Sequence, residues 1–410
     1  MNEINYKNLR ISGAFLVGGQ LFQAILAFGV NLVLVRHISP GEFGRFALIL
    51  AGTSIVYSVI SPRVNVLITR MPQANYNSKV KDMFFSAMTL ETLVGALIIS
   101  LWLIASDNAG LFEFMLVGAV GLRHWTDLNK AFFERSMPYR QLAVVETSAA
   151  AGGHFLALFL LLGGFGWIVL FIREMMISFI NLIGLWRIGG LTLYSPRLLS
   201  VSEWVVLYKD CKGVWLDGVM EGNFHRLTIL LAGLLGGEST AGLFFQAQRL
   251  AFVPHQILAP IVSRILAVWF GQTEDDGVRK AGRARVLRLL FLPLLLTGIL
   301  TLLFSDPVVP WLFGENWARV ADILMAMFGM VIFCTLFETL KAYCLTTRRT
   351  VTMFGGRVVQ YVGLLVPTAA GYSGWLSGDF ALAAGLSTAY FFAFLFIFIV
   401  LHLNERDTND

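Results

Sequence analysis

Long apolar segments alternate with short polar ones along almost the whole chain. An apolar helix of about 20 residues crosses the roughly 30 Å hydrocarbon core of a bilayer. A helix also pairs its backbone groups internally, which lipid requires. The pattern therefore predicts an all-α, polytopic membrane protein of about 12 transmembrane helices, at residues 10–35, 43–61, 84–106, 111–126, 142–163, 167–188, 213–235, 241–270, 287–305, 321–345, 357–375 and 380–402.

The composition agrees with this interpretation. Of 410 residues, 57% are hydrophobic and only 14% are charged, which is more apolar than a soluble domain. The first apolar segment follows Lys7 and Arg10, as a secretory signal would, but it is long and lacks a small-residue cleavage pattern. We interpret it as a retained helix.

Lys and Arg residues gather in every second loop. If the N-terminus is cytoplasmic, most of the 31 basic residues fall in inner segments, as the positive-inside rule requires. This distribution predicts that both termini are cytoplasmic. The positive charge is therefore explained by membrane topology, and we expect no nucleic-acid partner.

The basic segment around residues 191–212 divides the predicted helices into two sets of six. We expect an N-terminal lobe at residues 1–190, a cytoplasmic connector at 191–212, a C-terminal lobe at 213–403 and a cytoplasmic tail at 404–410. The segment PGEFGRFALILA (Pro40 to Ala51) is echoed by GESTAGLFFQAQRLA (Gly237 to Ala251). Two lobes that begin on the same side of the membrane predict a parallel repeat, which is typical of transporters.

Several charged residues lie inside predicted spans, where each costs about 2.5–3.5 kcal/mol unless it is paired or hydrated. They include Arg173, Arg226, Arg249, Glu174, Asp217 and Glu221. Asp217, Glu221 and His225 share one helix face, because they are spaced by four residues. Neutral polar residues lie on similar stripes: Gln20, Gln23, Asn31, Gln246 and Gln256.

Two interpretations of these charges remain open. Asp217, Glu221, Arg226 and Arg249 would neutralise one another as structural ion pairs, and Glu338 would pair with Lys341. Alternatively, Arg173, Arg226, Arg249 and the Gln and Asn residues line a lumen and bind an anionic substrate, since guanidinium groups bind phosphate or carboxylate in a bidentate manner. Asp217, Glu221 or Glu174 would then exchange H⁺ or Na⁺.

Enzymatic chemistry has little support. The sequence contains no GxxxxGK[ST] loop for ATP, no HExxH or CxxC motif, and no cluster of histidines, so we expect no metal or cofactor. The predicted outer loops are short, which argues against a membrane-embedded glycan polymerase or ligase with a catalytic loop. Transport is the favoured class.

Two short motifs indicate a family. Residues 12–52 run SGAFLVGGQLFQAILAFGVNLVLVRHISPGEFGRFALILAG, which resembles the opening of Wzx-type polysaccharide flippases: a first helix that ends in Arg, a turn with Pro and Glu, then Phe-Gly. The segment VVPWLFGENWA (Val308 to Ala318) is similar to a second hallmark of that family. The hallmark positions in this chain are Arg36, Pro40, Glu42, Phe43, Gly44, Phe313, Gly314, Glu315 and Trp317.

The resemblance implies a member of the multidrug, oligosaccharidyl-lipid and polysaccharide exporter superfamily. It implies a V-shaped pair of six-helix lobes that flips undecaprenyl-diphosphate-linked oligosaccharide across the bacterial cytoplasmic membrane by alternating access, coupled to H⁺ or Na⁺. The products would be surface polysaccharides such as lipopolysaccharide O-antigen or exopolysaccharide, with a polymerase and a chain-length regulator as partners. The hallmark residues would serve turns and packing, with Gly44 and Gly314 allowing close approach and Trp317 at the membrane interface.

A drug/cation antiporter of the same superfamily is the main alternative. Such a pump would favour an acidic lumen, whereas the arginines named above offset the carboxylates in this chain. Lipid II flippases have two further helices, so a peptidoglycan precursor is a less suitable cargo. The sequence names neither the sugar nor the driving ion.

Overall fold

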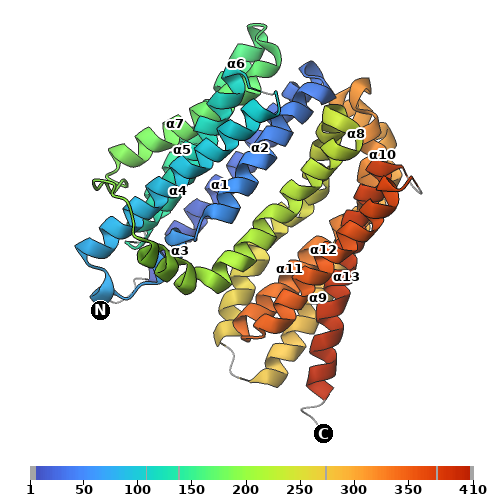
Figure 1. Cartoon of the computed structure of the whole chain (residues 1–410). Helices are drawn as coiled ribbons and strands as arrows, with labels where there is room; N and C mark the ends of the chain where they lie inside the picture. Colours follow the sequence, from blue (N-terminus) through green and yellow to red (C-terminus); the bar gives the residue numbers. More distant parts are fainter. Residues whose placement is uncertain (1–5, 108, 137–138, 273–274, 375–376, 407–410) are drawn as a thin grey trace. The chain divides into compact units, whose positions relative to one another are not determined.

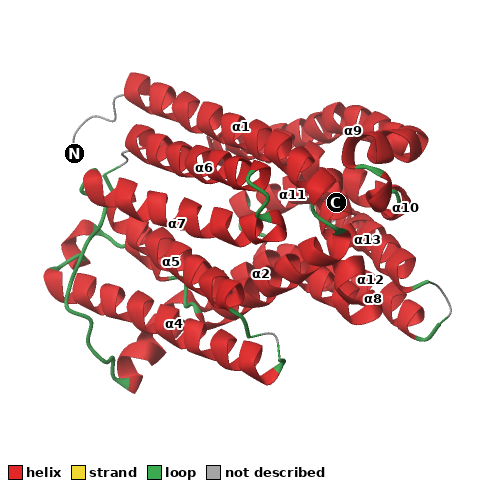
Figure 2. Cartoon of the chain, turned by 90° about the horizontal axis from the view of Figure 1, so that it is seen from above, coloured by secondary structure: helices red, strands yellow, loops and turns green. Residues whose placement is uncertain are grey.

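The computed structural model describes residues 6–107, 109–136, 139–272, 275–374 and 377–406. In this part of the chain every regular element is a helix (Figures 1 and 2). The predicted tail lies outside the described residues from position 407 onward. The helices are α1 (Tyr6–His37), α2 (Pro40–Ile60), α3 (Val64–Arg70), α4 (Ser78–Ala105), α5 (Leu111–Glu134), α6 (Tyr139–Leu162), α7 (Val169–Arg187), α8 (Val201–Gln272), α9 (Asp276–Phe313), α10 (Arg319–Ala326), α11 (Phe328–Thr346), α12 (Thr350–Tyr372) and α13 (Gly378–Arg406), with short 3₁₀ turns at Gln73–Asn75, Gly166–Ile168 and Glu315–Trp317.

The predicted spans fall on helices, with the span at 321–345 divided between α10 and α11, but the number twelve is not confirmed. Within the described residues, nine helices are long and apolar enough to cross a membrane. Two predicted spans lie in α8, whose backbone leaves helical geometry at Gly236 and Gly237, where the sequence predicts an outer turn. Helices α5 and α12 cover two more predicted spans and are not among the nine.

The chain divides into two compact units. Unit 1 contains Met1–Ile38 and Leu48–Leu227, and unit 2 contains Ser39–Ala47 and Thr228–Asp410. The boundary between them therefore falls inside α2 and inside α8. The predicted lobes at residues 1–190 and 213–403 have boundaries that differ from those of the two compact units. The division into two six-helix lobes stays a prediction.

Unit 1 is built around a row of helices. Its order is α1, α6, α7, α5 and α4, each in contact with the next, and Figure 2 shows this row from above. One end of this row holds a cluster of buried apolar side chains from α3, α4, α5 and the start of α8, including Ile68, Phe84, Leu128 and Leu207. In unit 2, α13 packs against α12 and α11, and α9 packs against α11 and α10.

The two hallmark segments of the sequence meet inside unit 2. The rings of Phe43 and Trp317 pack edge to face with centroids 5.6 Å apart, and both side chains are almost fully buried. Trp317 is therefore packed in the core of unit 2 and is not exposed to lipid headgroups, and its depth in the membrane stays a prediction. Gly314 ends α9 with φ 94°, so a left-handed backbone explains this glycine.

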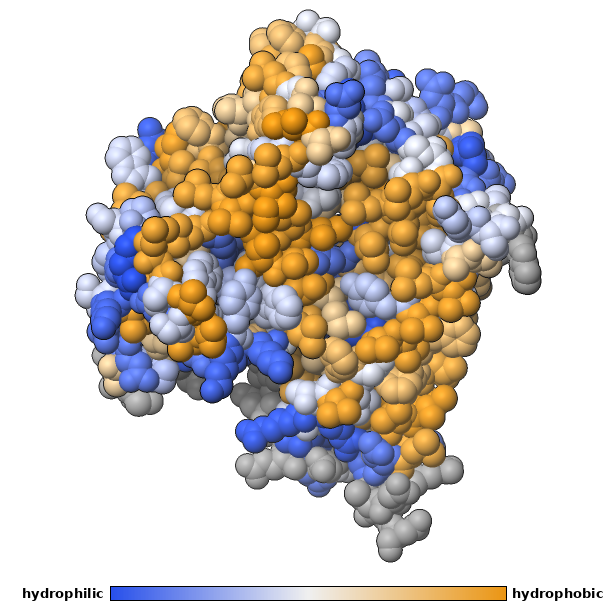
Figure 3. Space-filling model, viewed as in Figure 1, coloured by the Kyte–Doolittle hydropathy of each residue, from blue (hydrophilic) through white to orange (hydrophobic). Residues whose placement is uncertain are grey.

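The helices of each unit present apolar side chains outward. Figure 3 shows orange, hydrophobic residues over much of the visible helical surface, with blue residues gathered toward the helix ends. Exposed residues include Leu97, Leu101, Phe159, Leu292 and Val366. Such broad apolar exposure is typical of a protein that faces lipid rather than water.

Candidate functional site: charged groups inside unit 1

Two guanidinium groups converge on one glycine of α8. Helix α2 ends at Ile60, and the chain turns at Arg63, which adopts a left-handed backbone with φ 62°. A methyl group built on Gly222 would lie 3.6 Å from Arg63 Nη2 and 3.6 Å from Arg226 Nη1. The side chain of Arg63, from the turn after α2, and the side chain of Arg226, from α8 itself, therefore both lie next to Gly222.

Hydrogen bonds hold the first part of α8 against the end of α2. The Tyr208 hydroxyl donates to the carbonyl of Ile60, and Trp215 Nε1 donates to the carbonyl of Val59 at 2.9 Å. Gly218 leaves room for the Arg63 guanidinium, since a methyl group there would be 2.6 Å from Nη2. This packing fixes where the two arginines meet.

Arg226 has no carboxylate partner among the described residues. Its hydrogen bond is a long one, 3.4 Å, from Nη1 to the Ser54 carbonyl. The groups that interact electrostatically with Arg226 are Arg63 and Arg123, both of the same sign. The ion pair between Arg226 and Asp217 that the sequence allowed is therefore not formed in this part of the chain.

A second pair of arginines shares one carboxylate. Arg173 binds Glu174 Oε1 through Nε at 3.2 Å and Nη2 at 2.9 Å, and Arg123 Nη1 lies 3.7 Å from Glu174 Oε2. Arg173 is buried, with 7% of its surface exposed. Two positive groups thus face one negative group here, so the excess of positive charge extends from Arg226 to Arg123.

Glu91 is buried and forms a separate pair with His124. Its Oε1 lies 2.8 Å from His124 Nε2, and the His124 ring stacks on Tyr57 with centroids 4.6 Å apart. The guanidinium of Arg63 also interacts electrostatically with Glu91. Arg63 therefore interacts both with the pair of Glu91 and His124 and with Arg226.

The remaining predicted residues are distributed over both units. In unit 1, Gln23 Nε2 donates to Thr147 Oγ1 at 3.0 Å, Asn31 is buried, Gln20 and Glu221 are exposed, and Asp217 is half-buried. In unit 2, Gln246 is fully buried, Gln256 is exposed, and the guanidinium of Arg249 lies 5.6 Å from the Phe245 ring centroid. Their roles in a lumen stay a prediction.

Unit 2 has its own buried ionic cluster. Glu338 lies 3.3 Å from Lys341 Nζ and 3.0 Å from Arg357 Nη2, which confirms the pairing with Lys341 expected from their spacing. Arg357 Nη1 also donates to Gln360 Oε1 at 2.8 Å. The sequence did not single out Arg357, because its carboxylate partner Glu338 lies on another helix, 19 residues away. Gln360 was missed with it, since its hydrogen-bond partner is Arg357.

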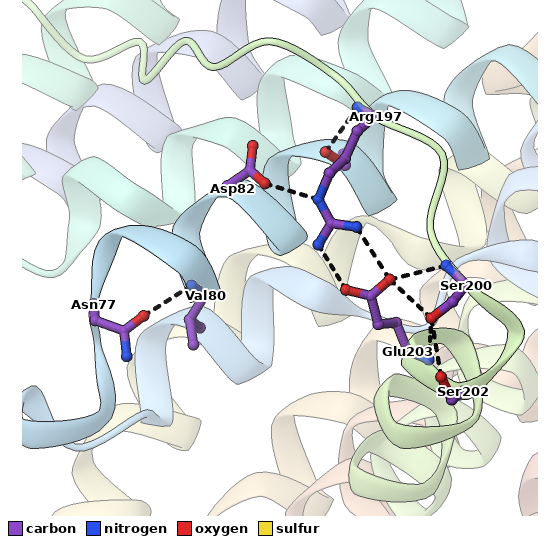
Figure 4. Close-up of polar contacts among 8 residues, drawn as sticks. Asn77, Val80, Asp82, Arg197, Ser200, Ser202 and Glu203 are labelled. Carbon is purple, nitrogen blue, oxygen red and sulfur yellow. Dashed lines mark hydrogen bonds and ion pairs between the residues drawn. The ribbon is translucent and has the colours of Figure 1, made fainter.

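The predicted connector is clamped to unit 1 by Arg197 (Figure 4). Arg197 Nε donates to Asp82 Oδ2 at 2.9 Å, and Nη2 donates to Glu203 Oε1 at 2.6 Å. The Ser200 amide donates to Glu203 Oε2 at 2.8 Å, so Glu203 and Ser200 form a capping box at the start of α8. These bonds tie residues 197–203 to α4.

The hydrogen bonds from Arg197 and from the Ser200 amide lower the pKa of Glu203 to about 2. An acid whose pKa falls on folding stabilises the folded state above its ordinary pKa, and this contribution is lost as the pH drops toward the lowered value. The clamp should therefore stay intact through the mildly acidic range and open only near pH 2.

Arg197→Ala should loosen the connector without unfolding unit 1. We expect the peptide that contains residues 192–203 to exchange its amide hydrogens several-fold faster at neutral pH, as measured by mass spectrometry. Lys209→Ala is the matched control, because Lys209 is exposed on the next turns of α8. Equal exchange in the wild type and in Arg197→Ala would show that the clamp does not hold this segment.

Comparisons with known proteins agree with the helical architecture. The family model described as "Polysaccharide biosynthesis protein" matches residues 33–322. The chain is 24% identical over 323 residues to the succinoglycan biosynthesis transport protein ExoT of Rhizobium meliloti (strain 1021), covering 75% of this chain and 64% of that protein. It is 26% identical over 243 residues to the lipopolysaccharide biosynthesis protein WzxC of Escherichia coli (strain K12), covering 54% of this chain and 45% of the relative.

Solved structures share the fold. The lipid II flippase MurJ in an inward closed conformation matches with a TM-score of 0.71 at 12% identity, covering 94% of this chain and 87% of MurJ. An inward-facing multidrug resistance MATE family transporter of the MOP superfamily matches with a TM-score of 0.68 at 12% identity, covering 96% and 98%. The chain thus has a MATE- and MurJ-like transporter fold, and it spans less than two thirds of the length of the two curated relatives.

Proposed function

Because the chain belongs to the polysaccharide biosynthesis protein family, we propose that it flips undecaprenyl-diphosphate-linked oligosaccharide repeat units across the bacterial cytoplasmic membrane for surface polysaccharide assembly. The relatives named as a succinoglycan transport protein and a lipopolysaccharide biosynthesis protein support this cargo class. The transporter fold supports alternating access as the mechanism. A polymerase and a chain-length regulator are the partners that such a product would require.

The observation that carries the proposal is the convergence of Arg63 and Arg226 over Gly222. Two guanidinium groups repel each other, and holding both at one place is costly unless an anion joins them. A diphosphate has two negatively charged phosphates that can accept bidentate hydrogen bonds from both groups. The missing carboxylate partner of Arg226 among the described residues leaves that role to a ligand.

Ion coupling is part of the proposal. Asp217 and Glu221 lie one turn apart on α8, on the same helix as Arg226, so we propose them as groups that take up H⁺ or Na⁺. Glu174 is held by two arginines, which makes it the weaker candidate, because neighbouring cations favour the ionised carboxylate. Arg173, Arg249 and the Gln and Asn residues remain proposed lumen contacts.

Reconstituted protein tests the cargo directly. Proteoliposomes that contain the wild type should translocate a fluorescent prenyl-diphosphate oligosaccharide faster than empty vesicles and should leave a small cationic dye in place. The arginine pair would repel such a dye, which is why a drug/cation antiporter is the weaker candidate. Export of the dye without movement of the lipid-linked sugar would refute the proposal in favour of that antiporter.

A further inference from the structure

Glu91 is buried in unit 1 and pairs with the half-buried His124 of the neighbouring helix α5. Glu91 lies near the centre of α4 (Ser78–Ala105), and 2% of its side chain is exposed. The imidazole of His124 on α5 bonds to the carboxylate at 2.8 Å. A buried carboxylate is costly to keep, so its pairing calls for a specific explanation.

The partner of Glu91 differs from those of two other carboxylates inside the bundle. Glu174 is paired with Arg173 and Arg123, and Glu338 is paired with Arg357 and Lys341. Guanidinium and ammonium groups keep their protons at physiological pH, so those pairs have a constant charge. Histidine is the side chain whose ordinary pKa lies near neutrality, so the Glu91 pair can gain or lose a proton.

Groups from several elements face this pair. Tyr57 of α2 stacks on His124. The Ser61 hydroxyl and the Arg63 guanidinium interact with Glu91. Tyr208 and Cys211 of α8 interact electrostatically with the Glu91 carboxylate. Tyrosine and cysteine are neutral at physiological pH. Arg63 is therefore the permanent charge among these neighbours, and it is also a member of the arginine pair with Arg226.

We propose that Glu91 and His124 form a proton-binding site that sets the affinity of the Arg63–Arg226 pair for a phosphate anion. When the pair loses a proton, its added negative charge offsets the positive charge of Arg63. When the pair gains a proton, that offset disappears and the arginines attract an anion more strongly. This inference rests on the proposed function, because it requires the anion to bind at Arg63 and Arg226.

Thermodynamic linkage allows two measurements of the proposed coupling: the effect of pH on anion binding and the proton uptake caused by anion binding. If protonation strengthens anion binding, then anion binding must cause proton uptake by the same coupling. Calorimetry of the purified protein in two buffers with different ionisation enthalpies reports that uptake. The probe is a short-chain prenyl-diphosphate disaccharide, a diphosphate diester whose own charge is constant between about pH 6 and pH 8.

We expect the wild type to bind the probe several-fold more tightly at the lower pH and to take up a fraction of one proton per bound probe. Glu91→Gln keeps the shape of the side chain and should abolish both effects. His124→Gln should also abolish both effects. This second variant replaces Glu91→Gln in the test if Glu91→Gln does not yield monodisperse protein. Glu146→Gln is the matched control, because Glu146 is a carboxylate of unit 1 paired with Lys130, and it should take up protons like the wild type.

The outcomes separate this inference from the proposed function. Wild-type proton uptake in both Glu91→Gln and His124→Gln would overturn the inference alone, provided that Arg226→Ala weakens probe binding. Unchanged binding in Arg226→Ala, or no binding by the wild type, would overturn the anion site and this inference with it.

Discussion

Replacing Arg226 by alanine is expected to abolish surface polysaccharide while the amount of protein in the membrane stays unchanged. A hydrogen bond to a charged group contributes about 1.5–3 kcal/mol, which corresponds to roughly ten- to a hundredfold weaker binding of the diphosphate. Arg226 has no carboxylate partner among the described residues, so its removal leaves no buried acid uncompensated. Polysaccharide is quantified on cells that express each variant, and membrane protein is quantified by immunoblot.

Arg63→Ala should have the same effect, because both side chains reach Gly222. Arg226→Lys should retain part of the export, since lysine keeps the charge but loses the bidentate geometry. Arg70→Ala is the matched control in unit 1, because Arg70 is exposed at the end of α3. Normal polysaccharide export in both Arg63→Ala and Arg226→Ala would show that these two arginines do not form an anion-binding site.

The second large effect is expected where two helices cross through glycines. A methyl group on Gly44 would lie 1.6 Å from the Glu238 carbonyl oxygen, and one on Gly242 would lie 1.9 Å from the Pro40 carbonyl oxygen. Each glycine thus meets the carbonyl four residues before the other, which is the reciprocal contact expected of two equivalent segments. Backbone cannot move aside as a flexible side chain can, so a methyl group must push α2 and α8 apart.

We expect Gly44→Ala to cost about 3 kcal/mol of stability and to lower the melting temperature in detergent by roughly 5–10 °C. Gly242→Ala should cost a similar amount, and the double variant less than the sum, because the helices separate only once. Gly41→Ala is the control on the same helix, since nothing lies within 4 Å of that position. A wild-type melting curve for Gly44→Ala would contradict the close crossing.

The hallmark residues show which structural roles a local sequence pattern can predict and which it cannot. The sequence predicted that Gly44 serves close approach, and the crossing with α8 confirms it. The same reasoning did not predict the burial of Trp317, because the sequence around an aromatic residue near a helix end is the same whether lipid headgroups or a neighbouring ring cover it. Only the position of Phe43, more than 250 residues earlier, decides that Trp317 is buried.

The membrane class and the helical architecture could be predicted from the sequence alone, because hydrophobicity and helix length are properties of contiguous residues and the bilayer acts on each segment separately. The sequence also identified Arg226, since a charge in an apolar segment is visible without a fold. Which charged side chains contact one another could be seen only in the packed fold. Arg63 looked like a loop residue of the inner surface, and Glu91 and His124 lie 33 positions apart. Such pairings depend on how the helices pack. The sequence pattern does not predict that packing, because the apolar faces of the helices have similar compositions and could pack in several ways.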